Sequence, residues 1–234
     1  MIPKHIFQSW HTTDLQPQIQ KYIDEMKTHN PEYTHKIYTD SEMDSFVNEN
    51  FKGTIADCYN KLNIIVAKVD FWRYLILYKY GGVYLDMDSY INKPLRELIK
   101  DDDEAIITAE NNPNLFVQWA LIFDKKHPIL QVVIELVVLN IKNNKYPNDI
   151  HQMTGPSVFS HAVNLVHVNN NGKRIRHNLI HSNFDMTFKC RNCSYRIYSI
   201  DYNDYLIFKH KDSGFLYNSK KHWRDEQKIK PLLL

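Results

Sequence analysis

The stretch Gly81–Leu95, GGVYLDMDSYINKPL, is the most informative part of the sequence. Strand-forming residues follow its glycine pair, and two carboxylates follow them. Because successive side chains of a strand point to opposite faces, we expect Tyr84, Asp86 and Asp88 on one face. The apolar residues expected together on the other face are Val83, Leu85 and Met87. Two carboxylates so close repel each other unless a positive charge lies between them. An isolated Asp-x-Asp could simply be the polar end of a strand in water. Evidence for a ligand-binding site must therefore come from the rest of the chain.

Length and composition are those of one ordinary globular domain, with 234 residues, 43% hydrophobic and 24% charged. The 29 Lys and Arg nearly balance the 27 Asp and Glu, which argues against a nucleic-acid-binding protein. We expect no secretory signal in MIPKHIFQSW, and the apolar run Ile129–Ile141 is too short for a transmembrane segment. The expected protein is soluble and cytoplasmic, with peripheral membrane association left open.

Three cysteines do not make a disulfide framework in such a compartment. Cys190 and Cys193 form a C-x2-C pair, and His177 and His181 precede them, so a zinc set is an alternative. The order is reversed from the common zinc finger. Reduced surface thiols are therefore the simpler expectation.

Apolar periodicity predicts alternating strands and helices over the first half of the chain. Strands are expected at KHIFQSW, THKIYTD, VYLDMD, EAIITAE and LFVQWALIF, and in the last third at RIYSI and YLIFKH. Helices are expected at about 18–29, after a cap at Asp40 or Ser41, and at about 63–80, 128–141 and 157–168. No repeat or linker is evident, so the pattern predicts an α/β sheet with helices on both faces.

The helix expected at about 63–80 carries one acid and one base, Asp70 and Arg73, a turn apart on an apolar flank. A surface ion pair at this spacing would contribute only about 0.2–0.5 kcal/mol. On an apolar flank, however, an unpaired charge would be costly, so the pair indicates a site. Gly81 stands where a glycine C-cap belongs, directly before the strand.

IPKHIFQSW, NPEY…YTD and AKVDFWRYLILYKYGGVYLDMD strongly resemble the Asp-x-Asp sugar transferases of glycosyltransferase family 32. A similar D-x-x-R, with an aspartate thirteen residues after the arginine (86 minus 73), occurs in the large glucosylating bacterial toxins. The resemblance covers the first 100 residues, continues weakly through DKKHP and TGPSVF, and is vague after about residue 170. It implies one glycosyltransferase A-type domain over 1–234, a mixed sheet flanked by helices. About 1–110 would bind the nucleotide-sugar and metal, and about 111–234 would form the acceptor side and the C-terminal closure.

The resemblance implies a metal-dependent, retaining hexosyltransferase, of the kind used in polysaccharide biosynthesis. The donor would be a UDP- or GDP-linked sugar, and the acceptor a glycan, glycolipid or protein. A divalent cation, Mn²⁺ or Mg²⁺, would neutralise the leaving diphosphate and make two adjacent aspartates tolerable. Double displacement and front-face return both remain open, because no second carboxylate can be assigned as the nucleophile.

The family pattern also implies residue roles. Asp88 would ligate the metal directly, whereas Asp86 would hold ribose or sugar hydroxyls and bind the metal through water. Arg73 would contact the donor diphosphate or sugar, and Asp70 would hold hydroxyls of the transferred sugar. Tyr84 resembles a donor-contacting tyrosine, with simple packing as the alternative.

Three aromatic or histidine positions extend the predicted site. Trp10, after the first strand, would stack on the nucleotide base by analogy with the toxins, although it could be core. The third metal ligand is expected at His210, after the apolar strand YLIF. His222, followed by Trp223, is the competing assignment. TGPSVF from Thr154 and AENN from Ala109 are expected to border the acceptor pocket.

Two other classes of protein remain as alternatives. VYLDMDSYI imitates the D-x-D of haloacid-dehalogenase-like phosphohydrolases, but Ser89-Tyr90 fits poorly where those sites want a threonine. A non-catalytic nucleotide-sugar or carbohydrate-binding protein could carry the same fold. Hydrolysis of a phosphomonoester would favour the first alternative, and binding without turnover the second.

Overall fold

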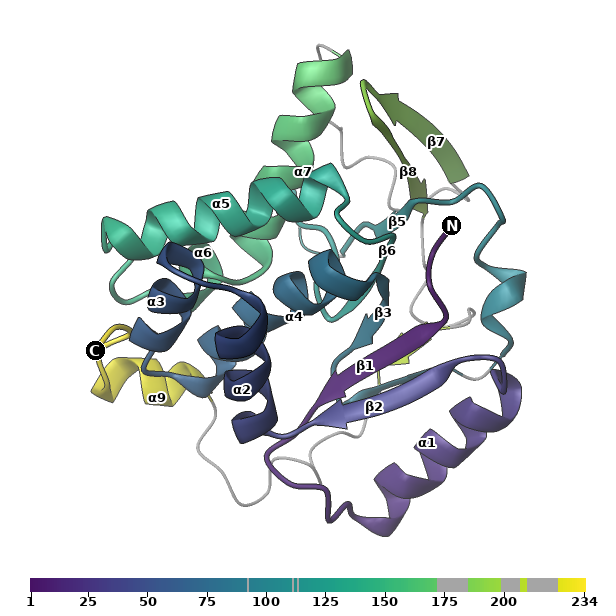
Figure 1. Ribbon diagram of the computed structural model, residues 1–234, viewed down its shortest axis with the longest axis horizontal. Helices are drawn as coiled ribbons and strands as arrows, with labels where there is room; N and C mark the ends of the chain where they lie inside the picture. The colour runs from purple at the N-terminus through teal and green to yellow at the C-terminus, as the bar shows by residue number, and fades with distance from the viewer. Residues whose placement is uncertain (92, 111, 113, 172–184, 199–206, 210–222) are drawn as a thin grey trace.

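The computed structural model describes the chain except residues 92, 111, 113, 172–184, 199–206 and 210–222. A seven-stranded mixed sheet forms its centre, in the order β2-β1-β3-β6-β5-β8-β7 (Figure 1). These strands are β1 (His5–Ser9), β2 (Thr34–Tyr38), β3 (Gly82–Leu85), β5 (Ala105–Thr108), β6 (Ala120–Phe123), β7 (Asp185–Cys190) and β8 (Cys193–Tyr198). A second, two-stranded sheet pairs β4 (Ser89–Ile91) with β9 (Ile207–Lys209).

The strand directions make the sheet mixed. β1 pairs in parallel with both β2 and β3, and β5 pairs in parallel with β8. The pairs β3–β6, β5–β6 and β7–β8 are antiparallel. The carboxyl ends of β2, β1 and β3 therefore lie at one edge of the sheet, where ligands of α/β proteins commonly bind.

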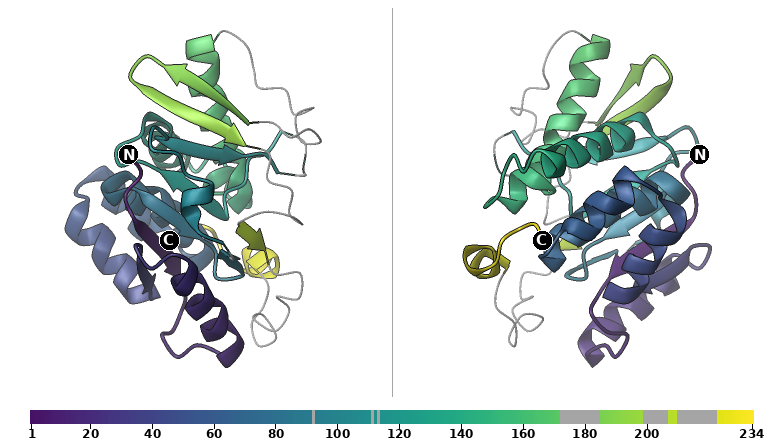
Figure 2. Two further views of the ribbon diagram at one scale, coloured as in Figure 1. Left: turned by 90° about the vertical axis from the view of Figure 1, so that its right-hand side faces the viewer. Right: turned by 60° about the vertical axis from the view of Figure 1, so that its left-hand side comes forward.

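Helices cover both faces of the sheet, as the sequence predicts (Figure 2). Side chains of alternating strand residues divide between two hydrophobic clusters: Phe7, Tyr84 and Leu121 belong to one, and Ile6 and Val83 to the other. The first cluster includes residues of α2 (Asp40–Asn50), α4 (Ile65–Tyr80), α5 (Pro128–Lys142) and α7 (Pro156–Asn171). The second cluster includes Met26 of α1 (Pro17–His29).

The remaining helices of the described residues are shorter. They are α3 (Thr54–Lys61), α6 (Ile150–Met153), α9 (Trp223–Ile229) and a 3₁₀ turn at Leu95–Glu97. Within the described part of the chain, no helix is long and apolar enough to cross a membrane.

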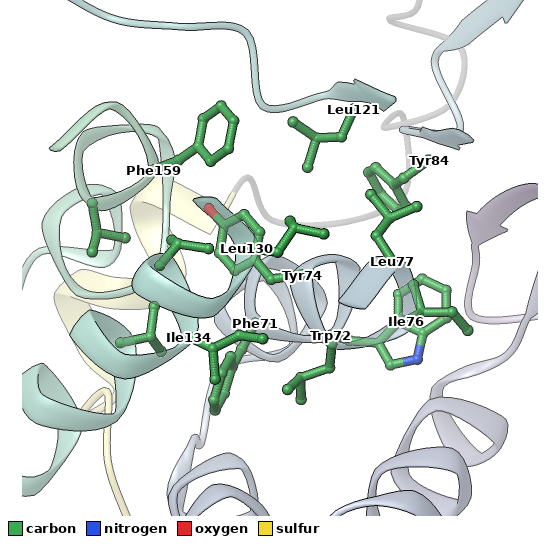
Figure 3. Close-up of a cluster of buried hydrophobic side chains, with 14 of the residues drawn as sticks. Phe71, Trp72, Tyr74, Ile76, Leu77, Tyr84, Leu121, Leu130, Ile134 and Phe159 are labelled. Atoms are coloured by element: carbon green, nitrogen blue, oxygen red, sulfur yellow. The ribbon is translucent and has the colours of Figure 1, made fainter. Parts of the chain in front are cut away.

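Helix α4 is apolar nearly all round and is buried between the sheet and α5, as expected for a central helix. Figure 3 shows Leu130 and Ile134 of α5 on one side of it and Tyr84 of β3 near its Leu77. The ring of Tyr74 stacks on Phe159 of α7, with 5.9 Å between the ring centroids. This packing fixes the two charged residues of α4 relative to the sheet.

The glycine pair after α4 makes the predicted sharp turn into β3. Gly81 has φ +67° and donates its N–H to the Leu77 carbonyl at 2.8 Å, which closes the helix. Gly82 has φ +112°, and a Cβ there would lie 2.6 Å from the His5 carbonyl oxygen on β1. Both conformation and close approach therefore require glycine at this point.

The strand after the glycines is shorter than expected. β3 ends before Asp86, and the N–H of Ser89 donates to the Asp86 carbonyl at 3.0 Å, so these residues form a turn. The prediction that Met87 shares a face with the apolar residues of β3 is wrong, because the turn redirects it. Met87 packs instead against Ile19 and Ile23 of α1.

The cap of α2 also differs from the prediction. Thr39, rather than Asp40 or Ser41, is the N-cap, since the N–H of Glu42 donates to its hydroxyl at 3.3 Å. The Glu42 carboxylate in turn accepts from the Thr39 N–H at 2.8 Å. The sequence T-x-x-E thus forms a capping box, which satisfies two backbone donors and outweighs either alternative cap.

The expected state of two cysteines is corrected by the structure. Cys190 and Cys193 face each other across the β7–β8 hairpin and form a disulfide, with 5.0 Å between the Cα atoms. The hairpin register brings them within disulfide reach. They are therefore neither reduced thiols nor zinc ligands here, and His177 and His181 lie outside the described residues.

The C-terminal residues return to the start of α4. Leu233 forms a bridge with Leu62, and the N–H of Asn63 donates to the Leu232 carbonyl at 2.9 Å. Leu232 is buried. The beginning of the helix that carries Asp70 and Arg73 is thus held by the end of the chain.

Candidate functional site

The site lies at the carboxyl ends of β1 and β3. Since β1 and β3 are parallel neighbours, the residues after each strand emerge at the same edge of the sheet. Gln8 of β1 donates its side-chain N–H to the Asp86 carbonyl at 3.3 Å, and Trp10 donates its backbone N–H to Tyr38 of β2 at 3.0 Å. Trp10 and the Asp86–Asp88 turn therefore belong to one region.

Arg73 is the centre of a buried ion-pair network. Its Nη2 lies 3.1 Å from Asp70 Oδ1 and 3.2 Å from Asp86 Oδ1. Its Nη1 donates to the Gln118 carbonyl at 3.0 Å, and its guanidinium lies 4.6 Å from the centroid of the Tyr84 ring. Burial alone would lower the Arg73 pKa, but Asp86, Tyr84 and Asp70 raise it, so the side chain carries its charge inside the protein.

Asp70 is buried, with 4% of its surface exposed, and is held by three side chains. Gln118 donates to Oδ1 at 3.1 Å, Thr154 donates to Oδ2 at 3.1 Å, and Arg73 pairs with Oδ1. Burial raises the pKa of Asp70 to about 6, and the Asp86 charge adds to this, whereas Arg73 and the two hydrogen bonds lower it. The alternative of a surface ion pair is therefore excluded, and Asp70 and Arg73 form part of a buried network.

Asp86 is the open member of this network. Tyr84 donates its hydroxyl to Asp86 Oδ1 at 2.7 Å, the same oxygen that pairs with Arg73. The Asp86 side chain keeps 27% of its surface exposed, against 6% or less for Asp70 and Arg73. Of the three charged groups, Asp86 is the one best placed to meet a ligand.

The chemistry of the carboxylates fits the predicted divalent cation. Asp86 and Asp88 supply hard oxygen donors from one turn, and Mg²⁺ commonly uses one or two carboxylates together with waters and substrate phosphates. Asp88 is 6% exposed. Among the residues that the structure describes, no group of three His, Cys, Asp or Glu side chains gathers to hold a metal. The two aspartates therefore fit a cation that takes its other ligands from water, from the donor or from a residue outside the described part of the chain.

The predicted histidine ligands lie outside the described residues, which exclude both His210 and His222. The last described residue before His210 is Lys209, and it pairs with Ser89, next to Asp88. The third metal ligand stays a prediction.

Trp10 is half-buried and packs beside Ile19, Ile23 and Met87. One part of the indole thus belongs to the apolar cluster under α1, while the residue keeps an exposed part at the sheet edge. The position agrees with both expected roles, and stacking on a nucleotide base stays a prediction.

The polar residues that hold Asp70 were not assigned from the sequence. Gln118 was only part of an expected strand, and Thr154 only part of a segment expected near the acceptor. The sequence feature that could identify such residues is a polar side chain in an otherwise apolar stretch, as for Gln118 in LFVQWALIF. Such residues are buried only when they are hydrogen-bonded, which marks them as candidates for a network.

The two segments expected to border the acceptor pocket lie close to each other. The backbone N–H of Phe116, which bridges to Ala109, donates to the Ser160 hydroxyl of α7 at 2.8 Å. α7 directly follows the Thr154–Gly155 pair. The structure thus places Ala109, through Phe116, near the end of TGPSVF, and Thr154 at the start of that segment contacts Asp70. Their role toward an acceptor stays a prediction.

Comparison with known families identifies the region that contains the network. Residues 16–105 match the family described as "Glycosyltransferase sugar-binding region containing DXD motif". The match includes Asp70, Arg73, Asp86 and Asp88. This part of the chain is thus similar to the sugar-binding region of DXD glycosyltransferases.

Curated relatives extend the similarity of this sugar-binding region and its flanks. An initiation-specific alpha-1,6-mannosyltransferase of Candida albicans is 26% identical in an alignment of 201 positions, which covers 69% of this chain and 52% of that protein. Inositol phosphoceramide mannosyltransferase 3 of Schizosaccharomyces pombe is 28% identical over 163 residues, 68% of this chain and 44% of that protein. The chain spans about half the length of these relatives. The resemblance to Asp-x-Asp sugar transferases is confirmed.

A solved structure gives the fold around the sugar-binding region. The PaToxG glycosyltransferase superposes with a TM-score of 0.57 at 19% identity, over 70% of this chain and 68% of that one. The predicted glycosyltransferase A-type fold, a mixed sheet flanked by helices in a single domain, is confirmed.

Proposed function

We propose that this protein is a metal-dependent, retaining glycosyltransferase that moves a hexose from a nucleotide-diphosphate sugar to an acceptor hydroxyl. The bond between sugar C1 and the diphosphate oxygen breaks, and its electron pair leaves with the nucleoside diphosphate. A bond from the acceptor oxygen to C1 forms, and the acceptor's hydroxyl proton passes to the released diphosphate or to solvent. Acceptors in this proposal are glycans, glycolipids or proteins.

One observation carries the proposal: a single buried Arg73 nitrogen joins Asp70 to Asp86, the first aspartate of the DXD motif. Burying the charges of Asp70 and Arg73 is costly unless they pair with good geometry, so the arrangement is more than a surface ion pair. It lies within the matched sugar-binding region and at the edge of the sheet where ligands of α/β folds bind.

The proposed roles follow from exposure and charge. Asp86 and Asp88 would hold Mn²⁺ or Mg²⁺, which when bound would neutralise charge on the diphosphate as it leaves. Arg73 holds the carboxylates of Asp70 and Asp86, which leaves fewer of its N–H groups for the nucleotide-sugar donor. Asp70, fixed between three donors, would accept hydrogen bonds from sugar hydroxyls. Trp10 would stack on the base, and Tyr84 orients Asp86.

Mannose is the first sugar to test, because two of the relatives are named as mannosyltransferases. The nucleotide could be GDP or UDP. Retention leaves double displacement and front-face return as the two routes. The proposal also includes a cytoplasmic location for the protein.

The test is a donor panel with the wild-type protein. Release of nucleoside diphosphate from GDP-mannose, UDP-glucose, UDP-galactose and UDP-N-acetylglucosamine is followed with Mn²⁺ and with EDTA, with and without a mannoside acceptor. We expect release from one donor, dependent on the metal and stimulated by the acceptor. Tight binding without any release would favour a non-catalytic binding protein, and hydrolysis of p-nitrophenyl phosphate alone would favour a phosphohydrolase.

A further inference from the structure

Beyond the charged network, a ring of uncharged polar side chains surrounds the Asp70 carboxylate. Gln118 Nε2 donates to Asp70 Oδ1 at 3.1 Å and to the Tyr74 hydroxyl at 2.6 Å. Tyr74 donates its proton to the Thr154 carbonyl at 3.0 Å, and the Thr154 hydroxyl donates to Asp70 Oδ2 at 3.1 Å. The hydrogen bonds thus form a closed circuit through these four residues.

The circuit fixes the direction of each hydrogen bond. Ionised Asp70 can only accept, so the Gln118 amide must turn its NH₂ group toward it. The two amide protons then serve Asp70 and Tyr74, and the tyrosine proton is left for the Thr154 carbonyl. Both carboxylate oxygens of Asp70 are therefore held in position by a donor with a determined orientation.

Three separate elements supply these groups. Asp70 and Tyr74 come from α4, Gln118 from the segment before β6, and Thr154 from the residue that ends α6. Figure 3 shows Tyr74 projecting from α4 toward Phe159 of α7. The carboxylate is thereby held between parts of the chain that are 36 to 84 residues apart.

Gln118 and Thr154 are themselves buried, at 5% and 0% exposed. Any effect of Thr154 on a bound molecule must therefore pass through the carboxylate that it holds. Neither residue belongs to the matched region 16–105.

We propose that Gln118 and Thr154 are positioning residues, which set the orientation of the Asp70 carboxylate that receives the donor's sugar hydroxyls. This inference rests on the proposed function and deepens it. It requires that the sugar part of donor binding depends on the two residues, whereas binding of the nucleoside diphosphate does not.

The experiment compares two dissociation constants for each variant, measured by calorimetry with Mn²⁺. The probes are GDP with GDP-mannose and UDP with UDP-glucose, and the pair that the wild type binds is used. The readout is the ratio of the nucleotide-sugar constant to the diphosphate constant. A general loosening of the fold moves both constants together and leaves this ratio unchanged.

Thr154→Val removes the hydroxyl and keeps the shape, whereas Thr154→Ser keeps the hydroxyl. We expect the ratio to rise about tenfold in Thr154→Val, as for a lost hydrogen bond to a charged group, and to stay within about twofold of wild type in Thr154→Ser. The matched control is Thr187→Val, at an exposed position on β7, which should leave the ratio unchanged. If Thr154→Val does not fold, Gln118→Asn, which keeps the amide and shortens its reach, is read in the same way.

Each outcome decides one of the two proposals. An unchanged ratio in Thr154→Val and Gln118→Asn, or an equal rise in Thr154→Ser and Thr154→Val, overturns the positioning role. A wild type that binds none of the four probes overturns the proposed function itself.

Discussion

At the scale of single residues, Arg73 makes a contact that could not be predicted from the sequence, namely its ion pair with Asp86. Its spacing from Asp70 on an apolar flank predicts a site, and the structure adds that its Nη2 also pairs with Asp86 on the turn after β3. A guanidinium can serve two carboxylates and a carbonyl at once because its donors are fixed in one plane. The side chain thus links the helix to the DXD turn.

Arg73→Lys should lower transfer activity nearly as much as Arg73→Ala, by about two orders of magnitude, because one ammonium cannot satisfy Asp70, Asp86 and the Gln118 carbonyl together. Steady-state rates of donor turnover check this. The control is Arg96→Lys at a side chain that is 67% exposed, which should change little. If Arg73→Lys kept most of the activity, charge alone would explain the residue.

Gly82→Ala should lower the free energy of unfolding by about 1–3 kcal/mol or more, because it combines a positive φ with a Cβ 2.6 Å from the His5 carbonyl. Gly53 has φ +60°, but a Cβ there would meet no atom within 4 Å. Gly53→Ala therefore introduces only the unfavourable backbone conformation and should lower the free energy of unfolding by less. Urea denaturation of both variants measures the difference. Equal losses in the two variants would show that the approach to β1 is unimportant.

At the scale of elements, the sequence predicts some helices and strands well and others not at all. Strands β1 to β3 and helices α1, α4 and α5 follow their apolar periodicity within a few residues. β7 and α3 were not predicted, because exposed residues dominate β7 and α3 is only eight residues long. The site followed the same division: Asp70, Arg73, Asp86 and Asp88 could be found by motif, whereas Gln118 and Thr154 reach Asp70 only through tertiary structure.

A buried ion pair adds to the backbone pairing that joins β8 to the rest of the sheet. Arg196 on β8 is 2% exposed and donates through Nε to Asp103 at 2.9 Å, with Asp185 of β7 also paired to it. Arg196→Ala should cost about 3–5 kcal/mol, since it leaves Asp103 buried and unpaired. Lys228→Ala, which breaks an exposed pair with Asp225, should cost at most about 1 kcal/mol. Chemical denaturation compares the two, and a small loss in Arg196→Ala would contradict the structural role.

At the scale of the whole molecule, the C-terminal residues and strand β1 both contact the ends of α4. The C-terminal residues bridge to Leu62 just before the helix, and the glycine pair ties its end to β1. Because its packing also involves the sheet and α5, movement of the helix would displace the carboxylate network. The stability of the fold and the geometry of the site are therefore coupled.

The pH dependence of overall stability should contain a contribution from His35. Burial, together with the Lys27 charge, lowers the pKa of His35 to about 4, and its Nε2 lies 2.8 Å from Gln8 Oε1. Because the unfolded chain takes up this proton near pH 6.5 and the folded chain does not, the contribution is present above about pH 6.5 and is lost toward pH 4. We expect about 1–3 kcal/mol, measured as the difference between wild type and His35→Gln in urea unfolding at pH 7.5 and pH 5. The same pH dependence in both proteins would contradict the assignment.

The central claim is that Asp86 and Asp88 hold a divalent cation for transfer of a sugar from its nucleotide. The most direct measurement is the Mn²⁺ titration of donor turnover in the wild type, in Asp88→Asn and in the exposed control Asp101→Asn. The wild type and the control should saturate at the same Mn²⁺ concentration, whereas Asp88→Asn, still folded by circular dichroism, should lose about two orders of magnitude in rate. Turnover that persists in EDTA, or an Asp88→Asn protein with the wild-type Mn²⁺ curve, would contradict the claim.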